Sequence, residues 1–507
     1  MSLGARVRMR PLLYPAAILL AFVLNFLVDT GVSPYAAARP LIVAFVVGVA
    51  LPWSAGLATG DRHLAGLMGG VLVLFLLAAQ APIIVVLCVV ALILVGFQRL
   101  LARRRAVSRA AGERLWPVVT RVLTAGGLIL LVAVGVKAAQ LELDRIGIIA
   151  HDLVAESPFR AHAAVASSPV DLPNMYFILL DGYPRADKLK SEFGIDVSGF
   201  TRGLGDRGFF VATHSRSNYT ITHLTLAQMF NYAPNVGVAA GPDGTRFVPW
   251  RHRINEGRFF SDVRGLGYEV VAVSPAFEHV ALRQADRFID TGQLNEFEWN
   301  VAQMTGVLPL VDSLLPSLAA DLHRARVLSA FDATEEVAGE ASTQPRFVFT
   351  HVVAPHSPQV FQDDGAVVEI RGFALPYDDR QEASQLGLAE YSRRLGGHVA
   401  FLNTRTLALV DRIIAADPAA VVVVFSDDGS KLANPADRRN GADLGTANLL
   451  AVRSPGKAGI IDDRSTLANL LPRLLRAYTG TGPPDVPETI FAWAEVPGAS
   501  FIFERPD

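Results

Sequence analysis

The run Val421–Gly429, with the sequence VVVVFSDDG, carries the strongest structural signal in the chain. Its four consecutive valines predict a β-strand that is buried on both faces, as in the centre of a parallel sheet. Two adjacent carboxylates, Asp427 and Asp428, follow where this strand should end, and the apolar run Met175–Leu180 leads into Asp181 in the same way. Burying like charges side by side is costly, and a bound cation would remove their repulsion. Because the carboxyl ends of parallel strands meet at one edge of a sheet, the sequence predicts a single metal site there.

Six short apolar runs in the second part of the chain alternate with segments of helical spacing. They are Met175–Leu180, Phe209–Ala212, Glu269–Val273, Arg346–Val352, Ala420–Ser426 and Ala447–Val452. Strands that alternate with helices predict a doubly wound, mostly parallel α/β/α sheet. We therefore expect residues 171–507 to form one α/β domain, with residues 141–170 as a connecting segment.

The first 140 residues are dominated by Ala, Leu, Val, Ile and Gly. Their apolar stretches are Leu12–Val28, Leu41–Leu57, Leu64–Ala79, Pro82–Phe97 and Val118–Val136. Most of them approach the length of a transmembrane helix, roughly 17–25 residues, so we expect a bundle of about five such helices in a multi-pass membrane protein. Arginine clusters precede the first stretch and separate the fourth from the fifth, and the positive-inside rule places both clusters in the cytoplasm. Residue 141 onward is then extracytoplasmic. A nucleic-acid or lipid contact is the alternative interpretation of the second cluster.

Composition narrows the classes of function further. The 507 residues contain 46 Lys and Arg against 48 Asp and Glu, for a formal net charge of −2. This balance lacks the basic excess of a nucleic-acid-binding protein, so no nucleic-acid partner is expected. The single cysteine, Cys88, lies in the apolar part. The outer domain therefore has no disulfide, no thiolate metal ligand and no cysteine nucleophile.

Two further segments contain residues that are common in active sites. Ser217–Phe230 begins with small hydroxyl residues and continues with apolar residues at helical spacing, which places Thr222 near the start of a helix. A threonine there can cap the helix or act as a nucleophile, and the residues alone leave both roles open. His351 and His356 stand near the end of a predicted strand, where a histidine is either structural or functional.

Taken in order, four motifs resemble those of the alkaline phosphatase/sulfatase superfamily. They are Asp181-Gly182-Tyr183, Asn218-Tyr219-x-x-Thr222-x-x-Thr225-Leu226-Ala227, His351-x-x-x-Pro355-His356 and Phe425-Ser426-Asp427-Asp428-Gly429. With the apolar N-terminal part, the chain is most similar to the membrane-anchored, sulfatase-like branch. That branch contains lipoteichoic acid synthase-like phosphoglycerol transferases and phosphoethanolamine transferases. The resemblance covers roughly residues 172–480 and the topology of the first 140.

The resemblance implies roles for individual residues. Asp181 and Asp427 correspond to acidic metal ligands, and Thr222 corresponds to a nucleophile that also binds the metal. Asp428 stands where the family has a histidine, and as a carboxylate it is a further candidate ligand. His356, with His351 as a second candidate, resembles histidines that contact the substrate phosphate or the leaving group.

The candidate ligands also indicate which cation to expect. Three carboxylates and one hydroxyl favour Mn²⁺ or Mg²⁺, with Ca²⁺ as a further candidate, over Zn²⁺. No histidine follows His398, whereas the two-zinc phosphatases of the superfamily use a late histidine, so one metal ion is expected. The segment around Thr222 also lacks the Cys/Ser-x-Pro-x-Arg motif of sulfatases, which argues against sulfate-ester hydrolysis.

These observations predict a membrane-anchored, metal-dependent transferase in the cell membrane. It would move a phosphoglycerol- or phosphoethanolamine-type head group from a phospholipid donor to a cell-envelope glycan or lipid through a phosphothreonine intermediate. The alternatives are a phosphodiesterase, phosphatase or sulfatase-like hydrolase, and a degenerate domain that binds without turnover. Asp428 in the usual histidine position keeps the last alternative open.

Overall fold

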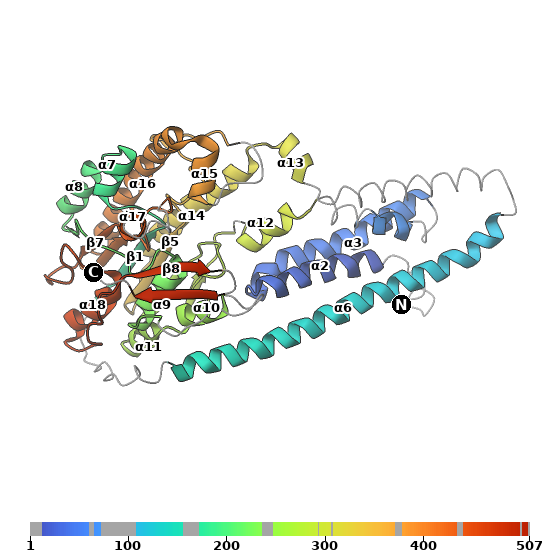
Figure 1. Cartoon of the computed structure of the whole chain (residues 1–507), viewed down its shortest axis with the longest axis horizontal. Coiled ribbons are helices and arrows are strands. Elements are labelled where there is room, and N and C mark those ends of the chain that lie inside the picture. Colours follow the sequence, from blue (N-terminus) through green and yellow to red (C-terminus); the bar gives the residue numbers. More distant parts are fainter. Residues whose placement is uncertain are drawn as a thin grey trace. The chain divides into compact units, whose positions relative to one another are not determined.

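The computed structural model describes residues 13–59, 65–71, 73, 108–155, 172–235, 247–292, 294–305, 308–370, 378–432, 440–496 and 499–504. These residues form two compact units, whose elements are labelled in Figure 1. One unit holds the described residues up to Gly147 together with Leu294–Leu315. The other contains the α/β domain.

The first unit is built from long apolar helices. They are α2 (Tyr14–Thr30), the short 3₁₀ helix η2 (Pro34–Ala37), α3 (Ala38–Thr59) and α6 (Ser108–Ala155). Residues Pro34–Ser54 and Pro117–Gly147 are long and apolar enough to cross a membrane, and Tyr14–Thr30 is a shorter apolar helix. The first, second and fifth predicted stretches therefore coincide with helices. The third is described only in part and the fourth lies outside the described residues, so a bundle of five is not confirmed.

A segment from much later in the chain completes this unit. Helix α12 (Glu296–Gln303) begins with a capping box formed by Asn295 and Glu298. Glu298 also receives two hydrogen bonds from Arg39, at 2.5 and 2.7 Å, and Asn295 Nδ2 donates to the carbonyl oxygen of Ala36 at 3.1 Å. Because α12 contacts the turn between α2 and α3, that turn and α12 lie on the same side of any membrane that these helices cross. Helix α13 (Leu308–Leu314) follows.

A seven-stranded sheet, with strand order β2-β7-β6-β1-β5-β3-β4, forms the centre of the second unit. The strands are β1 (Met175–Leu180), β2 (Phe210–Val211), β3 (Glu269–Val273), β4 (Arg287–Ile289), β5 (Arg346–Val352), β6 (Val421–Phe425) and β7 (Leu450–Arg453). The five strands from β6 to β4 are parallel, and β7 and β2 pair antiparallel at one edge. This confirms the predicted, mostly parallel α/β sheet. Strand β4 was not predicted, because its three residues are too few to show a pattern.

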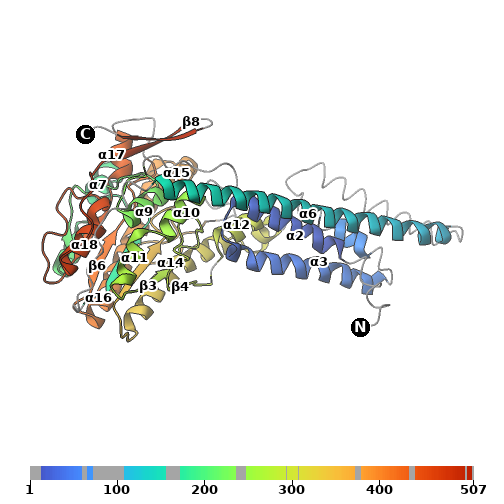
Figure 2. The same ribbon diagram turned by 90° about the horizontal axis from the view of Figure 1, so that it is seen from below.

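Helices cover both faces of this sheet (Figures 1 and 2). One face carries α9 (Thr222–Asn231), α10 (Val248–Asn255), α11 (Arg258–Gly265) and α18 (Leu470–Thr479), and the other carries α14 (Leu318–Gly339) and α16 (Leu388–Ala416). The ring of Phe230 in α9 contacts that of Phe349 in β5, with centroids 5.5 Å apart. On the opposite face, Thr334 in α14 hydrogen-bonds to Thr350 at 2.6 Å.

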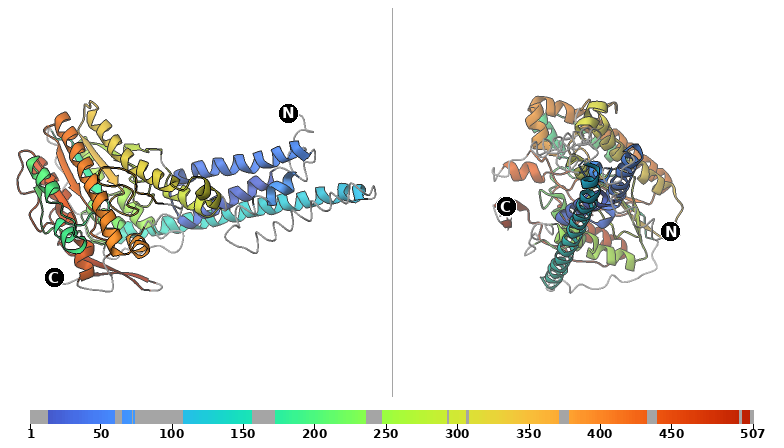
Figure 3. Two further views of the ribbon diagram at one scale, coloured as in Figure 1. Left: turned by 90° about the horizontal axis from the view of Figure 1, so that it is seen from above. Right: turned by 90° about the vertical axis from the view of Figure 1, so that its right-hand side faces the viewer.

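The remaining elements lie around this core. They are α7 (Ala186–Phe193), α8 (Ser198–Asp206), α15 (Asp379–Leu386), α17 (Asn440–Thr446), η4 (Leu467–Asn469), β8 (Phe491–Val496) and β9 (Ala499–Glu504). Strands β8 and β9 pair with each other as an antiparallel ribbon, and among the described strands neither belongs to the main sheet (Figure 3).

The sheet brings the predicted site residues to one edge. All residues of β1 and β6 are buried, as expected for strands with a parallel neighbour and helices on both faces. In the register of the sheet, Leu180 is opposite Val352, and Leu179 is opposite Phe425. The chain therefore leaves β1, β5 and β6 at the same level, which places Asp181 beside the segments that follow the other two strands.

Candidate metal centre

Three carboxylates converge at the carboxyl edge of the sheet. Asp181, Asp427 and Asp428 each offer one oxygen, and these oxygens lie within 4.8 Å of one another. All three residues are buried. Among the described residues, no hydrogen-bond partner reaches Asp181 Oδ1, Asp427 Oδ2 or Asp428 Oδ1. A buried carboxylate oxygen without a donor is unfavourable, so this donor set fits a bound divalent cation.

Hydrogen bonds from the strand ends hold the loops of the site in place. Ser426 is the hub: its hydroxyl donates to the Asp428 carbonyl at 2.7 Å and accepts from the Tyr183 N–H at 2.8 Å. The Gly182 N–H donates to Asp427 Oδ1 at 3.3 Å. The loop after β1 is therefore joined directly to the loop after β6, which keeps the carboxylates close despite their mutual repulsion.

Two glycines make these turns feasible. Gly182 follows Asp181 with φ of +70°, in the left-handed region that favours glycine. A Cβ at Gly429 would lie 2.1 Å from the Leu444 carbonyl oxygen, so the chain after Asp428 can approach its neighbour only without a side chain. The glycine after each acid in the sequence motifs thus has a steric cause.

His351 supports Asp181 from behind. Its ring is buried, and Nε2 donates to Asp181 Oδ2 at 2.9 Å. Burial acts to raise the pKa of Asp181, but the hydrogen bond from His351 and the positive charges of His356 and Lys431 hold it well below its usual value. Asp181 is therefore kept as a carboxylate, ready to bind a cation.

His356 has a different position and is only partly buried. Its backbone N–H donates to the Asp181 carbonyl at 3.0 Å, and its Nδ1 donates to the Ser357 carbonyl at 3.0 Å. The proton on Nδ1 leaves Nε2 as the nitrogen that can exchange a proton. Burial lowers the pKa of His356, but the charges of Asp181 and Asp379 outweigh it and raise the pKa above the ordinary value.

Thr222 is the first residue of α9, and Ile221 occupies the cap position without a side-chain hydrogen bond. Capping, which the sequence left open for Thr222, is therefore not its role. Burial and the charge of Asp181 raise the pKa of Asp427, and a hydrogen bond with the Thr222 side chain acts in the opposite direction. The hydroxyl thus lies next to the carboxylates, at a helix N-terminus whose N–H groups suit an incoming phosphate.

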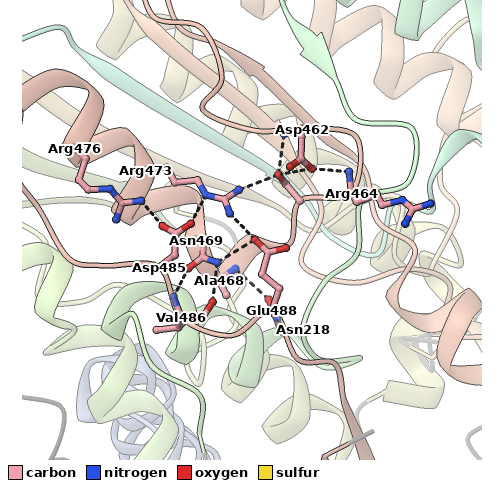
Figure 4. Close-up of polar contacts among 11 residues, drawn as sticks. Asn218, Asp462, Arg464, Ala468, Asn469, Arg473, Arg476, Asp485, Val486 and Glu488 are labelled. Atoms are coloured by element: carbon pink, nitrogen blue, oxygen red, sulfur yellow. Dashed lines mark hydrogen bonds and ion pairs between the residues drawn. The ribbon is translucent and has the colours of Figure 1, made fainter. Parts of the chain in front are cut away.

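The loop before Thr222 is held by the last part of the chain (Figure 4). Asn218 is buried and makes three bonds: Oδ1 accepts from the Ala468 N–H, Nδ2 donates to the Thr489 carbonyl, and its own carbonyl accepts from the Phe491 N–H, at 3.1, 2.9 and 2.8 Å. Ion pairs from Arg473 to Asp485 and Glu488 stabilise that segment. Sequence reasoning missed this support, because its partners are about 250 residues apart.

Lys431 is a charged member of the site that sequence reasoning also missed. Its Nζ pairs with Asp428 Oδ2. Burial and the charge of Asp427 raise the pKa of Asp428 well above its usual value, and Lys431 opposes this effect. In the sequence, Lys431 stands three residues after Asp428. This spacing alone does not show that the two side chains pair.

The structure thus gathers the predicted residues Asp181, Asp427, Asp428, Thr222 and His356 in one place. It puts His351 behind Asp181, so a direct contact between His351 and substrate is not the role that its position favours. The functional roles of these residues stay predictions.

No protein-family model and no curated protein matches this chain. Similar solved structures include the C-terminal periplasmic domain of EcEptC from Escherichia coli in complex with Zn, with 13% sequence identity and a TM-score of 0.42, covering 68% of this chain and 96% of that chain. Another is the integral membrane protein lipooligosaccharide phosphoethanolamine transferase A (EptA) from Neisseria meningitidis, with 13% identity and a TM-score of 0.40, covering 93% and 98%. A third is the phosphonate monoester hydrolase of Agrobacterium radiobacter, with 12% identity and a TM-score of 0.38, covering 64% and 80%.

These neighbours are the kinds of protein that the sequence motifs resemble. The likeness to these structures concerns the fold and does not extend to substrate or reaction.

Proposed function

We propose that this protein is a metal-dependent transferase that moves a phosphate-linked head group, with Thr222 as the nucleophile. The observation that carries the proposal is the convergence of three buried carboxylates beside the hydroxyl at the start of α9. Each carboxylate has one oxygen without a hydrogen-bond partner in the part of the chain that the structure describes. Phosphoryl transfer requires a positioned nucleophile and compensation of the charge on the phosphate oxygens.

The residues that would hold one divalent cation are Asp181, Asp427, Asp428 and Thr222. Their all-oxygen donor set favours Mn²⁺ or Mg²⁺, with Ca²⁺ as a further candidate, over Zn²⁺. When bound, such a cation lowers the pKa of a coordinated hydroxyl and neutralises charge on the phosphate.

The chain's own residues account for the two transfer steps. Thr222 Oγ releases its proton to water and attacks the donor phosphorus, the P–O bond to the lipid alcohol breaks, and the departing oxygen takes a proton from His356 Nε2. In the second step, neutral His356 accepts the proton of an acceptor hydroxyl, whose oxygen attacks the phosphothreonine. The bond from phosphorus to Thr222 Oγ then breaks, and Thr222 Oγ takes a proton back from water. The N–H groups of the first turn of α9 stabilise the phosphate oxygens in both steps.

The apolar helices favour lipid as the donor. Apolar helices α2, α3 and α6, the arginine cluster before α2 and the contact of α12 with the α2–α3 turn are consistent with an extracytoplasmic catalytic domain held at the cell membrane. A phospholipid donor and an envelope glycan or lipid acceptor would both be available there. Water as the acceptor would make the same centre a phosphodiesterase or phosphatase.

Mass spectrometry of the purified full-length protein tests this proposal. After incubation with Mn²⁺ and lipid extract, we expect an adduct on Thr222 whose mass gives the transferred group. Thr222→Ala should remove it, whereas Thr220→Ala, a matched change two residues away, should retain it. Analysis of the released products then separates transfer from hydrolysis. Metal-loaded protein that forms no adduct and turns over no phosphodiester would refute the enzyme proposal in favour of a binding domain.

A further inference from the structure

Lys431 lies at the boundary between the buried carboxylates and solvent. Its side chain is 23% exposed, whereas that of its partner Asp428 is 1% exposed. Asp428 uses Oδ2 for this ion pair, and its other oxygen, Oδ1, has no hydrogen-bond partner among the described residues. One carboxylate thus joins the ammonium group to the candidate metal position.

The charges of the centre indicate how many divalent cations it can bind. Asp181, Asp427 and Asp428 contribute three negative charges when they are ionised, and Lys431 contributes one positive charge, so these four groups together carry a net charge of −2. One divalent cation compensates that charge fully. Without Lys431, the three carboxylates would retain a negative charge after binding one ion, which would favour a second cation or a tighter first one.

We propose that Lys431 is a built-in counter-ion that takes the place of a second divalent cation and limits the centre to one metal ion. This inference rests on the proposed metal centre and assigns Lys431 a positioning role. Its pairing with one oxygen of Asp428 leaves the other oxygen directed at the metal position, as a partner in the outer sphere of a metal site does for a ligating carboxylate. It also explains how Asp428 can stand where the related family has a neutral histidine: Asp428 and Lys431 together are neutral as well.

Metal binding to full-length protein in detergent, stripped with chelator and titrated with Mn²⁺ in a calorimeter, tests the proposal. Wild type should bind one Mn²⁺ per chain. Lys431→Met should bind the first ion at least tenfold tighter or take up a second ion, as counted by elemental analysis. Lys431→Arg, which keeps the charge, and Lys190→Met, which removes a 70% exposed surface charge, should both stay within threefold of wild type.

A charge-neutral double variant keeps the test decisive if Lys431→Met alone does not fold. Asp428→Asn should weaken Mn²⁺ binding at least tenfold, since it removes a ligand charge and leaves Lys431 uncompensated. Asp428→Asn/Lys431→Met should bind at least tenfold tighter than Asp428→Asn.

The outcomes separate the two proposals. Equal or weaker binding by Lys431→Met, or no recovery in the double variant, would overturn the counter-ion role while the metal centre stands. A wild type that binds no Mn²⁺ would refute the metal centre itself, and the role of Lys431 with it.

Discussion

Replacing Asp427 with Asn should stabilise the metal-free protein and abolish its stabilisation by metal. The amide has the shape of the carboxylate, and its Oδ1 can still accept the Gly182 N–H that now binds Asp427 Oδ1. The substitution therefore removes one charge and one cation ligand from the centre with little change in packing. A gain in the stability of the metal-free protein would distinguish Asp427 from an ordinary structural residue, because most substitutions of buried polar groups destabilise a protein.

The size of the effect follows from the spacing of the carboxylates. Two unit charges at 4.8 Å repel by roughly 3 kcal/mol at an effective dielectric constant of about 20. The pKa values of Asp427 and Asp428 are raised, first by burial and then by neighbouring carboxylates, so proton uptake by these groups relieves part of this repulsion. We therefore expect a gain of about 1–2 kcal/mol in chelator, or roughly 2–6 °C in melting temperature.

Differential scanning fluorimetry of the full-length protein, with and without Mn²⁺, measures both effects. At 100 times its dissociation constant, a bound ion adds about 2.7 kcal/mol to the stability of the wild type, and Asp427→Asn should lose nearly all of it. The order of the melting temperatures should therefore reverse when metal is added. Asp206→Asn, an exposed acid-to-amide change, should follow the wild type in both conditions. A variant that melts below wild type in chelator, or gains as much from Mn²⁺, would refute a cation-binding carboxylate at position 427.

Four further changes probe the nucleophile, a buried histidine, the ion pair of α12 and the loop before Thr222. Thr222→Ala should lower kcat at least 10³-fold while Mn²⁺ affinity changes about tenfold or less, and retained turnover would exclude it as the nucleophile. Burial lowers the pKa of His398 from 6.5 to about 3, so the folded state excludes a proton that the unfolded chain binds. The free energy of unfolding should therefore fall from pH 6.5 downward, by up to about 5 kcal/mol at pH 3. In denaturant titrations between pH 6 and 4.5, His398→Asn should reduce the slope of this free energy against pH. An unchanged slope would mean that other groups cause the acid sensitivity. Arg39→Met leaves the buried Glu298 without its ion pair and should lower the stability of the α12 contact by about 1–2 kcal/mol. Limited proteolysis around α12 should then be faster. Unchanged proteolysis would mean that packing alone holds this helix. Asn218→Ala should lower kcat about 10–100-fold at unchanged Mn²⁺ affinity, because it frees the loop before the nucleophile, and an equal loss of metal binding would indicate general disruption.

Local sequence patterns predicted the sheet well. Strands β1, β3 and β5 have the predicted bounds, because continuous apolar runs in a parallel sheet are buried on both faces and leave a clear signal. Strand β4 left no such signal, because it has three residues and its side chains are only half buried. In the first unit, apolar length predicted the helices α2, α3 and α6 but not the packing of α12 against them, which depends on an ion pair between residues 259 positions apart.

In the candidate site, too, some features follow from local sequence and others depend on the tertiary structure. That acids follow buried strands is a local property, and it was enough to single out Asp181, Asp427 and Asp428 as members of one centre. Their distances, the place of His351 behind Asp181 and the pairing of Lys431 with Asp428 depend on how the loops after β1, β5 and β6 fold over one another. Electrostatic energy varies with separation and burial, and neither quantity is contained in residue order. The amino-acid sequence was therefore sufficient to identify the three carboxylates, and the folded chain was needed to show that Lys431 balances part of their charge.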